Sequence, residues 1–390
     1  MSSSITDPKQ WTLPNAERVI ETLKSLRTTQ RAGAPKGSHW TFSAAIVPVD
    51  LYAYLKGRFG DPNGFAMTLR SPSVDNLIHW NYTLEHPDTI LDIIGLNMRT
   101  EIRAYSARLD AAEWETLERN LRTEFDLQRG MIREVQDSFE RWQLFLNPYH
   151  RLTAIVDQYE RRLRSISIPK VLPPPIPSTR EQLERFRKEM NAAAELYQEA
   201  MALCVSLEMI APVMGEAAIN FIMLILAKPG IRTDQRMQED FTRRPIDVRI
   251  KSLSLVCDGV VVPITGAEAP FKDFLRIMNR RNDSLHGNID PRKATGDEIF
   301  FDLHNIPLLK TQRSFGEVAL SSALANLSPD SAIADVQTVR RFVEFILSCL
   351  DPRAKAVVQK LMAEQLLGFR PKTGTIGAIL PTPVDILVGE

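Results

Sequence analysis

A short polar cluster contains the residue types best suited to phosphodiester chemistry. It consists of Arg280, Arg281, Asn282 and His286, within the stretch from Phe271 to Arg292. Imidazole, with an unperturbed pKa of about 6.5, is suited to proton transfer near neutral pH. The guanidinium of Arg stays protonated, and its planar fork is suited to phosphate. These residue types therefore indicate a site that can bind and cleave a phosphodiester.

RNA is the substrate that such a site can cleave with the fewest catalytic groups, because the ribose 2′-hydroxyl of RNA serves as the nucleophile. A base takes the hydroxyl proton while cations stabilise the charge that grows on the phosphate, which leaves a cyclic phosphate and a 5′-hydroxyl. The sequence has no zinc-ligand spacing, Walker loop, dinucleotide-binding glycine fingerprint or nucleophile elbow. We therefore expect chemistry that uses neither a metal nor a cofactor.

The segment resembles the signature of the HEPN superfamily (higher eukaryotes and prokaryotes nucleotide-binding). That signature is an Arg, usually a polar residue directly after it, and a His four to six positions later. Arg281, Asn282 and His286 fit it, and Gly287 follows the His as it often does in this family. Of the six histidines, His286 alone has an Arg at a permitted distance upstream. Arg280 also fits with one more residue of spacing, so the choice of arginine stays open.

The resemblance implies an endoribonuclease in which His286 transfers the proton. Arg281 or Arg280 would bind the phosphate, and Asn282 would orient it by a hydrogen bond. Endoribonucleases of this family act in toxin–antitoxin systems and in antiviral (anti-phage) defence. The resemblance therefore implies RNA as the substrate and an antitoxin or another protein as a further partner. The alternative is a non-catalytic helical scaffold that uses a HEPN-like fold for dimerisation or binding.

The spacing within the motif leads to an expectation about assembly. On one helix, Asn282 and His286 share a face, but Arg281 lies well round the helix from His286. One chain therefore does not bring Arg281 and His286 together on one phosphate. The family resemblance implies that a homodimer does so, with two copies of the motif facing each other across a cleft.

The charge of the chain requires any RNA site to be local. Lys and Arg number 48 and Asp and Glu number 48, so the formal net charge is zero. Between Phe271 and Lys293, six basic residues stand against three acidic ones. We assign Arg276, Arg280 and Arg292 from this group as candidates for binding the substrate backbone. A second basic cluster lies upstream, at Arg243, Arg244, Arg249 and Lys251.

The motif is expected at the end of an amphipathic helix. Phe271, Phe274, Leu275 and Met278 are spaced three and four apart and form one apolar stripe. Gly287 then suits the left-handed turn that ends many helices. The polar cluster would thus lie at the C-terminal end of a helix that packs on a core.

The expected fold class is mainly α, in two domains. Residues 1–168 are predicted to form a mainly helical domain of unknown role, with helices at 88–109, 112–146 and 150–165 in a long hairpin or bundle. A proline-rich linker, 169–179, precedes a HEPN-like helical domain at 180–370 and a tail at 371–390. The helical domain is expected to contain minor β pieces.

Within the second domain, helices are expected at 180–207, 212–228, 245–257, 335–350 and 353–367, with a small hairpin at 299–309. Glu216 and Asn220 lie four apart in the most apolar of these helices. They are interpreted as packing residues with local hydrogen bonds, and the alternative is that they face the Arg and His cluster.

The remaining features favour a cytoplasmic protein without a membrane span. Cys204, Cys257 and Cys349 lie in apolar contexts and are interpreted as buried free thiols in a reducing compartment. The longest apolar run, 217–227, is too short to cross a bilayer.

Overall fold

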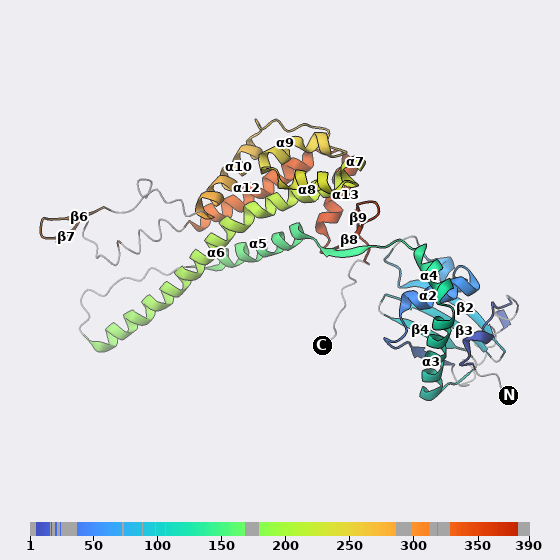
Figure 1. Ribbon diagram of the computed structural model, residues 1–390. Coiled ribbons are helices and arrows are strands. Elements are labelled where there is room, and N and C mark those ends of the chain that lie inside the picture. Colours follow the sequence, from blue (N-terminus) through green and yellow to red (C-terminus); the bar gives the residue numbers. More distant parts are fainter. Residues whose placement is uncertain are drawn as a thin grey trace. The chain divides into compact units, whose positions relative to one another are not determined.

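The computed structural model divides the chain into two compact units. One comprises Met1–Arg141 with Ile379–Glu390, and the other comprises Trp142–Ala378. The residues described are 5–15, 17, 20–21, 24, 37–71, 74–87, 89–97, 99–105, 107–167, 179–285, 298–311, 318 and 328–380 (Figure 1). The sequence placed the division at 169–179 instead; of that segment only Thr179 is described.

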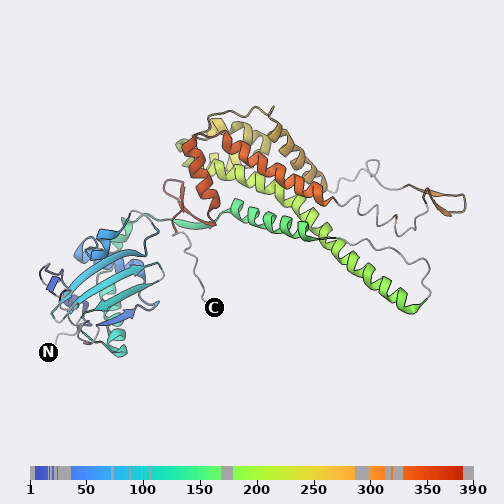
Figure 2. The same ribbon diagram turned by 180° about the vertical axis from the view of Figure 1, so that it is seen from behind.

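The first unit is built on a four-stranded antiparallel sheet in the order β1-β4-β3-β2. Its strands are β1 (Ser38–Thr41), β2 (Ile78–His86), β3 (Thr89–Leu96) and β4 (Thr100–Ala104). Two short 3-10 helices, η1 (Pro8–Gln10) and η2 (Phe65–Leu69), accompany α2 (Pro48–Phe59), α3 (Ala111–Leu127) and α4 (Arg129–Asp137). The three α-helices lie on one face of the sheet (Figure 2). Its core includes Tyr54, Tyr82, Leu91, Ile93, Ile102 and Trp114.

The helix expected at 88–109 is wrong, because β3 and β4 occupy this stretch. Pairing of β2 with β3 runs as far as His86 and Thr89, so the chain reverses between these two residues. Most residues of β3 are buried, which removes the polar and apolar alternation that marks a half-exposed strand. An apolar run without alternation has no clear period, and isoleucines four apart then imitate a helix face.

The single long helix expected at 112–146 is also wrong. It is two helices, α3 and α4, which meet at Gln128, where the backbone leaves helical geometry at φ −100° and ψ 18°. The last residues of the stretch form β5 (Gln143–Leu146), which pairs with β8 (Leu366–Arg370). The next helix, α5 (Pro148–Ser165), confirms the helix predicted at 150–165 but belongs to the second unit.

The second unit is a helical bundle around α6 (Arg180–Leu226), a helix of 47 residues. The sequence predicted two helices here, but α6 continues through Pro212. Apolar residues recur along it in alternating steps of four and three, and this stripe is buried. Its buried members include Cys204, Leu207, Ala211, Met214, Ala218 and Phe221.

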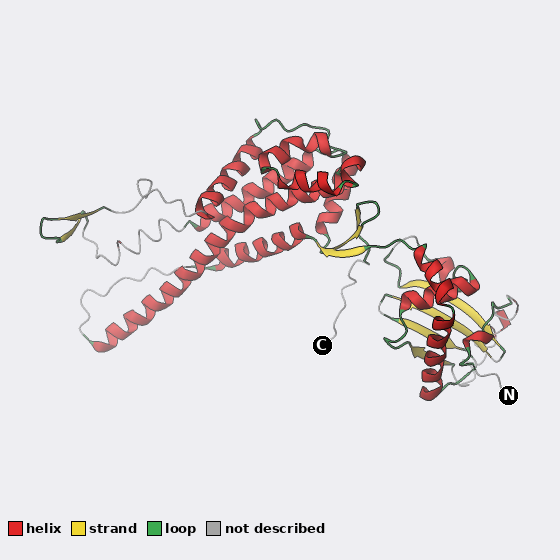
Figure 3. Cartoon of the chain, in the orientation of Figure 1, coloured by secondary structure: helices red, strands yellow, loops and turns green. Residues whose placement is uncertain are grey.

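Other elements complete the second unit (Figure 3). They are α7 (Pro229–Arg232), α8 (Gln235–Arg243), α9 (Ile246–Val256), α10 (Ala269–Leu285), α12 (Pro329–Ser348), α13 (Pro352–Ala363) and β9 (Thr375–Gly377), with the hairpin β6 (Ile299–Phe301) and β7 (Pro307–Leu309). The predicted mainly α character is therefore confirmed, as is the small hairpin. The expected helix at 353–367 ends at Ala363, and β8 follows it. Of the loose tail predicted at 371–390, residues 371–380 are described and contain β9, which pairs with β8, so the prediction is wrong for this part; the residues from 381 lie outside the described ones.

The apolarity of α6 serves packing. Among the described residues, α6 is the one helix long and apolar enough to cross a membrane. However, 61% of its most apolar window is buried inside the protein, as in the core helix of a soluble domain.

Gly215 allows α6 to approach the helices that pack against it. A Cβ at this position would lie 2.6 Å from Cε2 of Phe274 in α10 and 3.0 Å from Cγ1 of Val339 in α12. The ring of Phe274 cannot retreat freely, because it stacks on Phe342 with the two ring centroids 4.0 Å apart. The close approach also places the neighbouring residue, Glu216, against α10.

Gly215→Ala is therefore expected to destabilise the protein although Ala favours helix. Overpacking costs about 1–3 kcal/mol and exceeds the gain in helix propensity of about 1 kcal/mol. Thermal unfolding followed by circular dichroism measures the net loss, which the difference of these two values puts at up to about 2 kcal/mol. Gly230→Ala in α7 is the matched control, because no atom lies within 4 Å of its added Cβ. Equal melting temperatures for the two variants would show that the bundle adjusts without cost.

Candidate arginine site on the motif helix

Helix α10 is fixed by the apolar stripe that the sequence predicted. Of the predicted residues, Phe271, Phe274 and Met278 are buried in the core of the second unit and Leu275 is partly buried; Ile277, which the prediction did not name, is buried as well. The stacked rings of Phe274 and Phe342 join α10 to α12. The prediction of a packed helix that carries the motif arginines toward its C-terminal end is confirmed.

Arg281 continues this buried stripe, since it follows Phe274 by seven positions and Met278 by three. Its side chain is only 16% exposed. Its Nη2 lies 3.6 Å from Oε2 of Glu216 in α6 and 4.0 Å from Sδ of Met278. Arg281 thus points into the bundle, toward a carboxylate on the central helix.

Glu216 is shared between two arginines. Its Oε1 accepts a hydrogen bond from Nη2 of Arg249 in α9, while its Oε2 faces Arg281. Nη1 of Arg249 donates to Oδ1 of Asn220, one turn further along α6, at 2.5 Å. Glu216 therefore contacts the motif arginine directly, and Asn220 is linked to it through Arg249.

The four residues Glu216, Asn220, Arg249 and Arg281, here called the arginine network, carry two positive charges and one negative charge. The Arg249 side chain is 6% exposed. The Nε atoms of both arginines are buried and have no hydrogen-bond partner in the part of the chain that the structure describes. A buried donor without an acceptor costs free energy. Among the described residues, the network thus has spare donors and one positive charge more than it has carboxylates.

The other predicted site residues lie apart from this network. Arg280 pairs with Asp335 of α12, and its side chain is 46% exposed. Arg276 is an exposed residue in an ion pair with Asp273 at 3.1 Å. Asn282 is exposed near the end of α10. His286 and Arg292 lie outside the described residues.

Arg249 is the member of the network that the sequence did not single out. It was noted there only as part of a basic cluster. A sharper signal exists, because Arg249 stands four positions before Leu253 and seven before Val256, both buried. An arginine on the apolar face of a helix needs a partner of opposite charge in the core. The sequence offered one in Glu216, the carboxylate in the most apolar of the predicted helices.

The three cysteines take no part in this site. Cys204, Cys257 and Cys349 are free and buried, which confirms their interpretation as core thiols. Burial raises the pKa of Cys204 to about 11 and that of Cys257 to about 12, so both are neutral thiols near pH 7. Within the described ranges, no group of three His, Cys, Asp or Glu residues is placed to hold a metal ion.

Comparison with known proteins adds no relative: no protein-family model, curated protein or solved structure matches this chain.

Proposed function

We propose that the protein is a metal-independent endoribonuclease of the HEPN type, which cleaves RNA through attack of the 2′-hydroxyl. The observation that carries the proposal is the shared carboxylate of the arginine network. In the part of the chain that the structure describes, Arg281 and Arg249 together have one carboxylate, so a positive charge is left over beside the helix that leads to His286. An RNA phosphate is an anion that suits such a site.

Arg281 fits the role of phosphate ligand better than Arg280. Arg280 has a carboxylate of its own in Asp335, whereas Arg281 shares Glu216 with Arg249, lies 3.6 Å from it and keeps an Nε without a partner among the described residues. A guanidinium that is loosely paired loses less when it turns toward a phosphate. His286 takes the proton of the 2′-hydroxyl, and Asn282, exposed one residue after Arg281, orients the phosphate. Arg276, Arg280 and Arg292 bind the RNA backbone.

The proposal includes a homodimer with two motif helices facing one cleft, because the spacing within the motif does not bring Arg281 and His286 of one chain together on one phosphate. It also includes a role as a toxin or anti-phage effector in the cytoplasm, with an antitoxin or another protein as partner. Sedimentation of the active protein as a monomer at micromolar concentration would argue against a composite site.

The second candidate function is a non-catalytic helical scaffold. It is favoured by the pairing of both motif arginines with carboxylates of their own bundle, and by the low exposure of Arg281. In that case the arginine network fixes the packing of α6, α9 and α10 and binds no substrate.

Cleavage of total RNA in EDTA by purified protein separates the two candidates. We expect fragments with a cyclic phosphate and a 5′-hydroxyl. Arg281→Lys keeps the charge but loses the fork, and we expect it to slow cleavage by about 10²-fold or more. Arg280→Lys, the matched control, should slow it by less than about tenfold, as expected for an exposed contact to the RNA backbone. If the wild-type protein leaves RNA intact, the scaffold function replaces the nuclease.

A further inference from the structure

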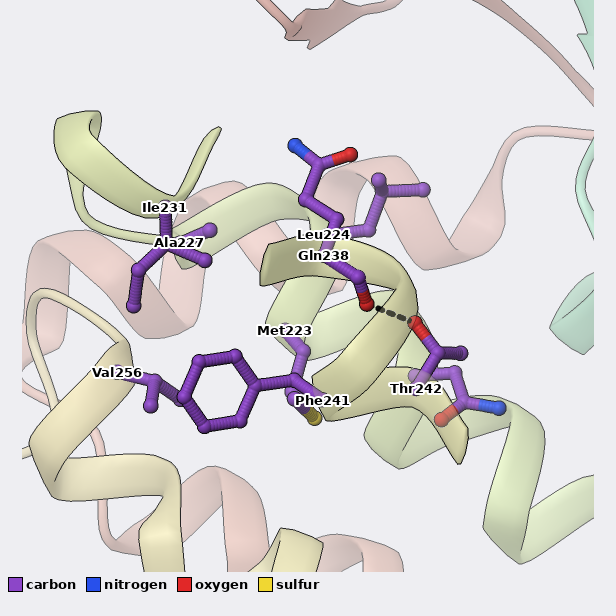
Figure 4. A pocket seen from close by; sticks show the side chains of 9 residues that line it. Met223, Leu224, Ala227, Ile231, Gln238, Phe241, Thr242 and Val256 are labelled. Atoms are coloured by element: carbon purple, nitrogen blue, oxygen red, sulfur yellow. Dashed lines mark hydrogen bonds between the residues drawn. The ribbon is translucent and has the colours of Figure 1, made fainter. Parts of the chain in front are cut away.

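A small apolar pocket lies beside the C-terminal part of α6, under the short helices α7, α8 and α9 (Figure 4). Its volume is about 170 Å³. The apolar lining includes Met223, Leu224, Ile231, Phe241 and Val256. No residue of α8 is fully buried, so the helix that covers the pocket packs loosely on the bundle.

Three polar residues also line the pocket, and two of them donate a hydrogen bond to a backbone carbonyl of the protein. Gln238 donates from Nε2 to the carbonyl oxygen of Arg232, and Thr242 donates from Oγ1 to the carbonyl oxygen of Gln238, both at 2.5 Å. Figure 4 shows Gln238 and Thr242 together on one side of the pocket, with Val256 and Ile231 on the other. The pocket is thus polar at one side and apolar at the other.

Asn220 is the polar lining residue whose amide nitrogen donates no hydrogen bond within the described part of the chain. Its Oδ1 accepts the hydrogen bond of Arg249. An amide nitrogen has two donor hydrogens, and the described residues provide Nδ2 of Asn220 with no acceptor. Because Arg249 holds Oδ1, it limits rotation of the amide, and Nδ2 is the atom left for a ligand.

We propose that this pocket binds a small aromatic molecule, about one ring in size, that carries a carbonyl acceptor. The size follows from the volume, since an apolar cavity of about 150 Å³ holds benzene. The acceptor follows from the free donor hydrogens of Asn220 Nδ2. The bound carbonyl and Arg249 use different atoms of the same amide, so ligand binding leaves the arginine network intact. The site does not depend on the proposed ribonuclease activity.

A matched pair of probes tests both parts of this proposal. Acetophenone has one ring and a carbonyl; ethylbenzene has nearly the same shape without the oxygen. Ligand-detected NMR titration of the full-length protein should show saturable binding of both. Acetophenone should bind about fivefold more tightly, the ratio expected of one neutral hydrogen bond.

Two variants assign the binding to this pocket. Asn220→Leu is nearly isosteric and should keep ethylbenzene binding while the preference for acetophenone falls below twofold. Thr242→Trp places a large ring at the pocket and should reduce binding of both probes at least tenfold. Gln235→Trp on the same helix does not line the pocket and should bind both probes like the wild type. A wild-type protein that binds neither probe, a preference that survives Asn220→Leu, or unchanged binding in Thr242→Trp would each overturn the assignment.

Discussion

His286→Ala is expected to abolish RNA cleavage while leaving the stability of the protein nearly unchanged. A positioned proton-transfer group contributes about 10²–10⁴-fold to the rate, so its removal should lower the single-turnover cleavage rate by that factor. Little packing should be lost, because the neighbouring Ser284 and Leu285 at the end of α10 are both exposed. Cleavage rate and melting temperature, measured on the same preparation, check the two halves of this prediction.

Phe274→Ala is the reference for the melting temperature of His286→Ala, because it shows how much the loss of a core side chain lowers the melting temperature. The ring of Phe274 is fully buried and stacked on Phe342, so its removal should lower the free energy of unfolding by about 3–5 kcal/mol. If His286→Ala melts as early as Phe274→Ala, the histidine is a structural residue. If His286→Ala cleaves RNA like the wild type, another group transfers the proton. Either result removes the main support for the nuclease.

The motif helix could be predicted because its signal is local and strong. Four large apolar residues at steps of three and four define one face, and no strand pattern competes with them. The hairpin at 299–309 was equally readable, since two short apolar runs flank the polar residues His304 and Asn305. Asn305 has a φ of +59°, a conformation that Asn tolerates in turns.

The sheet of the first unit could not be read in the same way. Strand β3 is buried on most of its length, so it lacks the alternation that identifies strands, although its pairing partners β2 and β4 are its neighbours in sequence. The boundary between the units was misplaced for a related reason. Strand β5 belongs to the second unit because it pairs with β8, more than 200 residues later in the sequence. A local sequence pattern does not identify a pairing partner at such a distance.

The candidate site was predictable in its residues but not in their contacts. The sequence named Arg281, Glu216 and Asn220, yet left open whether the last two face the motif. The contact between Glu216 and Arg281 depends on Gly215, which lets α6 approach α10. The link to Asn220 depends on Arg249, which lies on a third helix, α9. Such contacts follow from how helices pack, and helix periodicity alone does not determine packing partners.

Arg249→Met is expected to give the largest loss of stability among the polar residues of the bundle. Removing one partner of a buried ion pair typically costs about 3–5 kcal/mol, because the other charge stays buried without compensation. Glu216 is partly exposed and keeps Arg281, so its charge stays compensated; we expect a smaller loss, about 1–3 kcal/mol, which includes the cost of leaving Oδ1 of Asn220 without its donor. Met fills most of the volume of the Arg side chain, which limits any cavity. Urea unfolding followed by far-ultraviolet circular dichroism measures the change.

Arg243→Met is the control for the loss of a charge as such. Arg243 forms an exposed ion pair with Glu239 at 3.7 Å, and pairs of this kind contribute less than about 1 kcal/mol. If both variants lose the same free energy of unfolding, burial does not make the ion pair of Arg249 more stabilising than an exposed ion pair. Arg249→Met also tests the proposed function. Among the described residues, Glu216 then keeps Arg281 as its one arginine, so the carboxylate balances the remaining positive charge. With the excess positive charge gone, RNA cleavage should fall along with stability, whereas Arg243→Met should leave it unchanged.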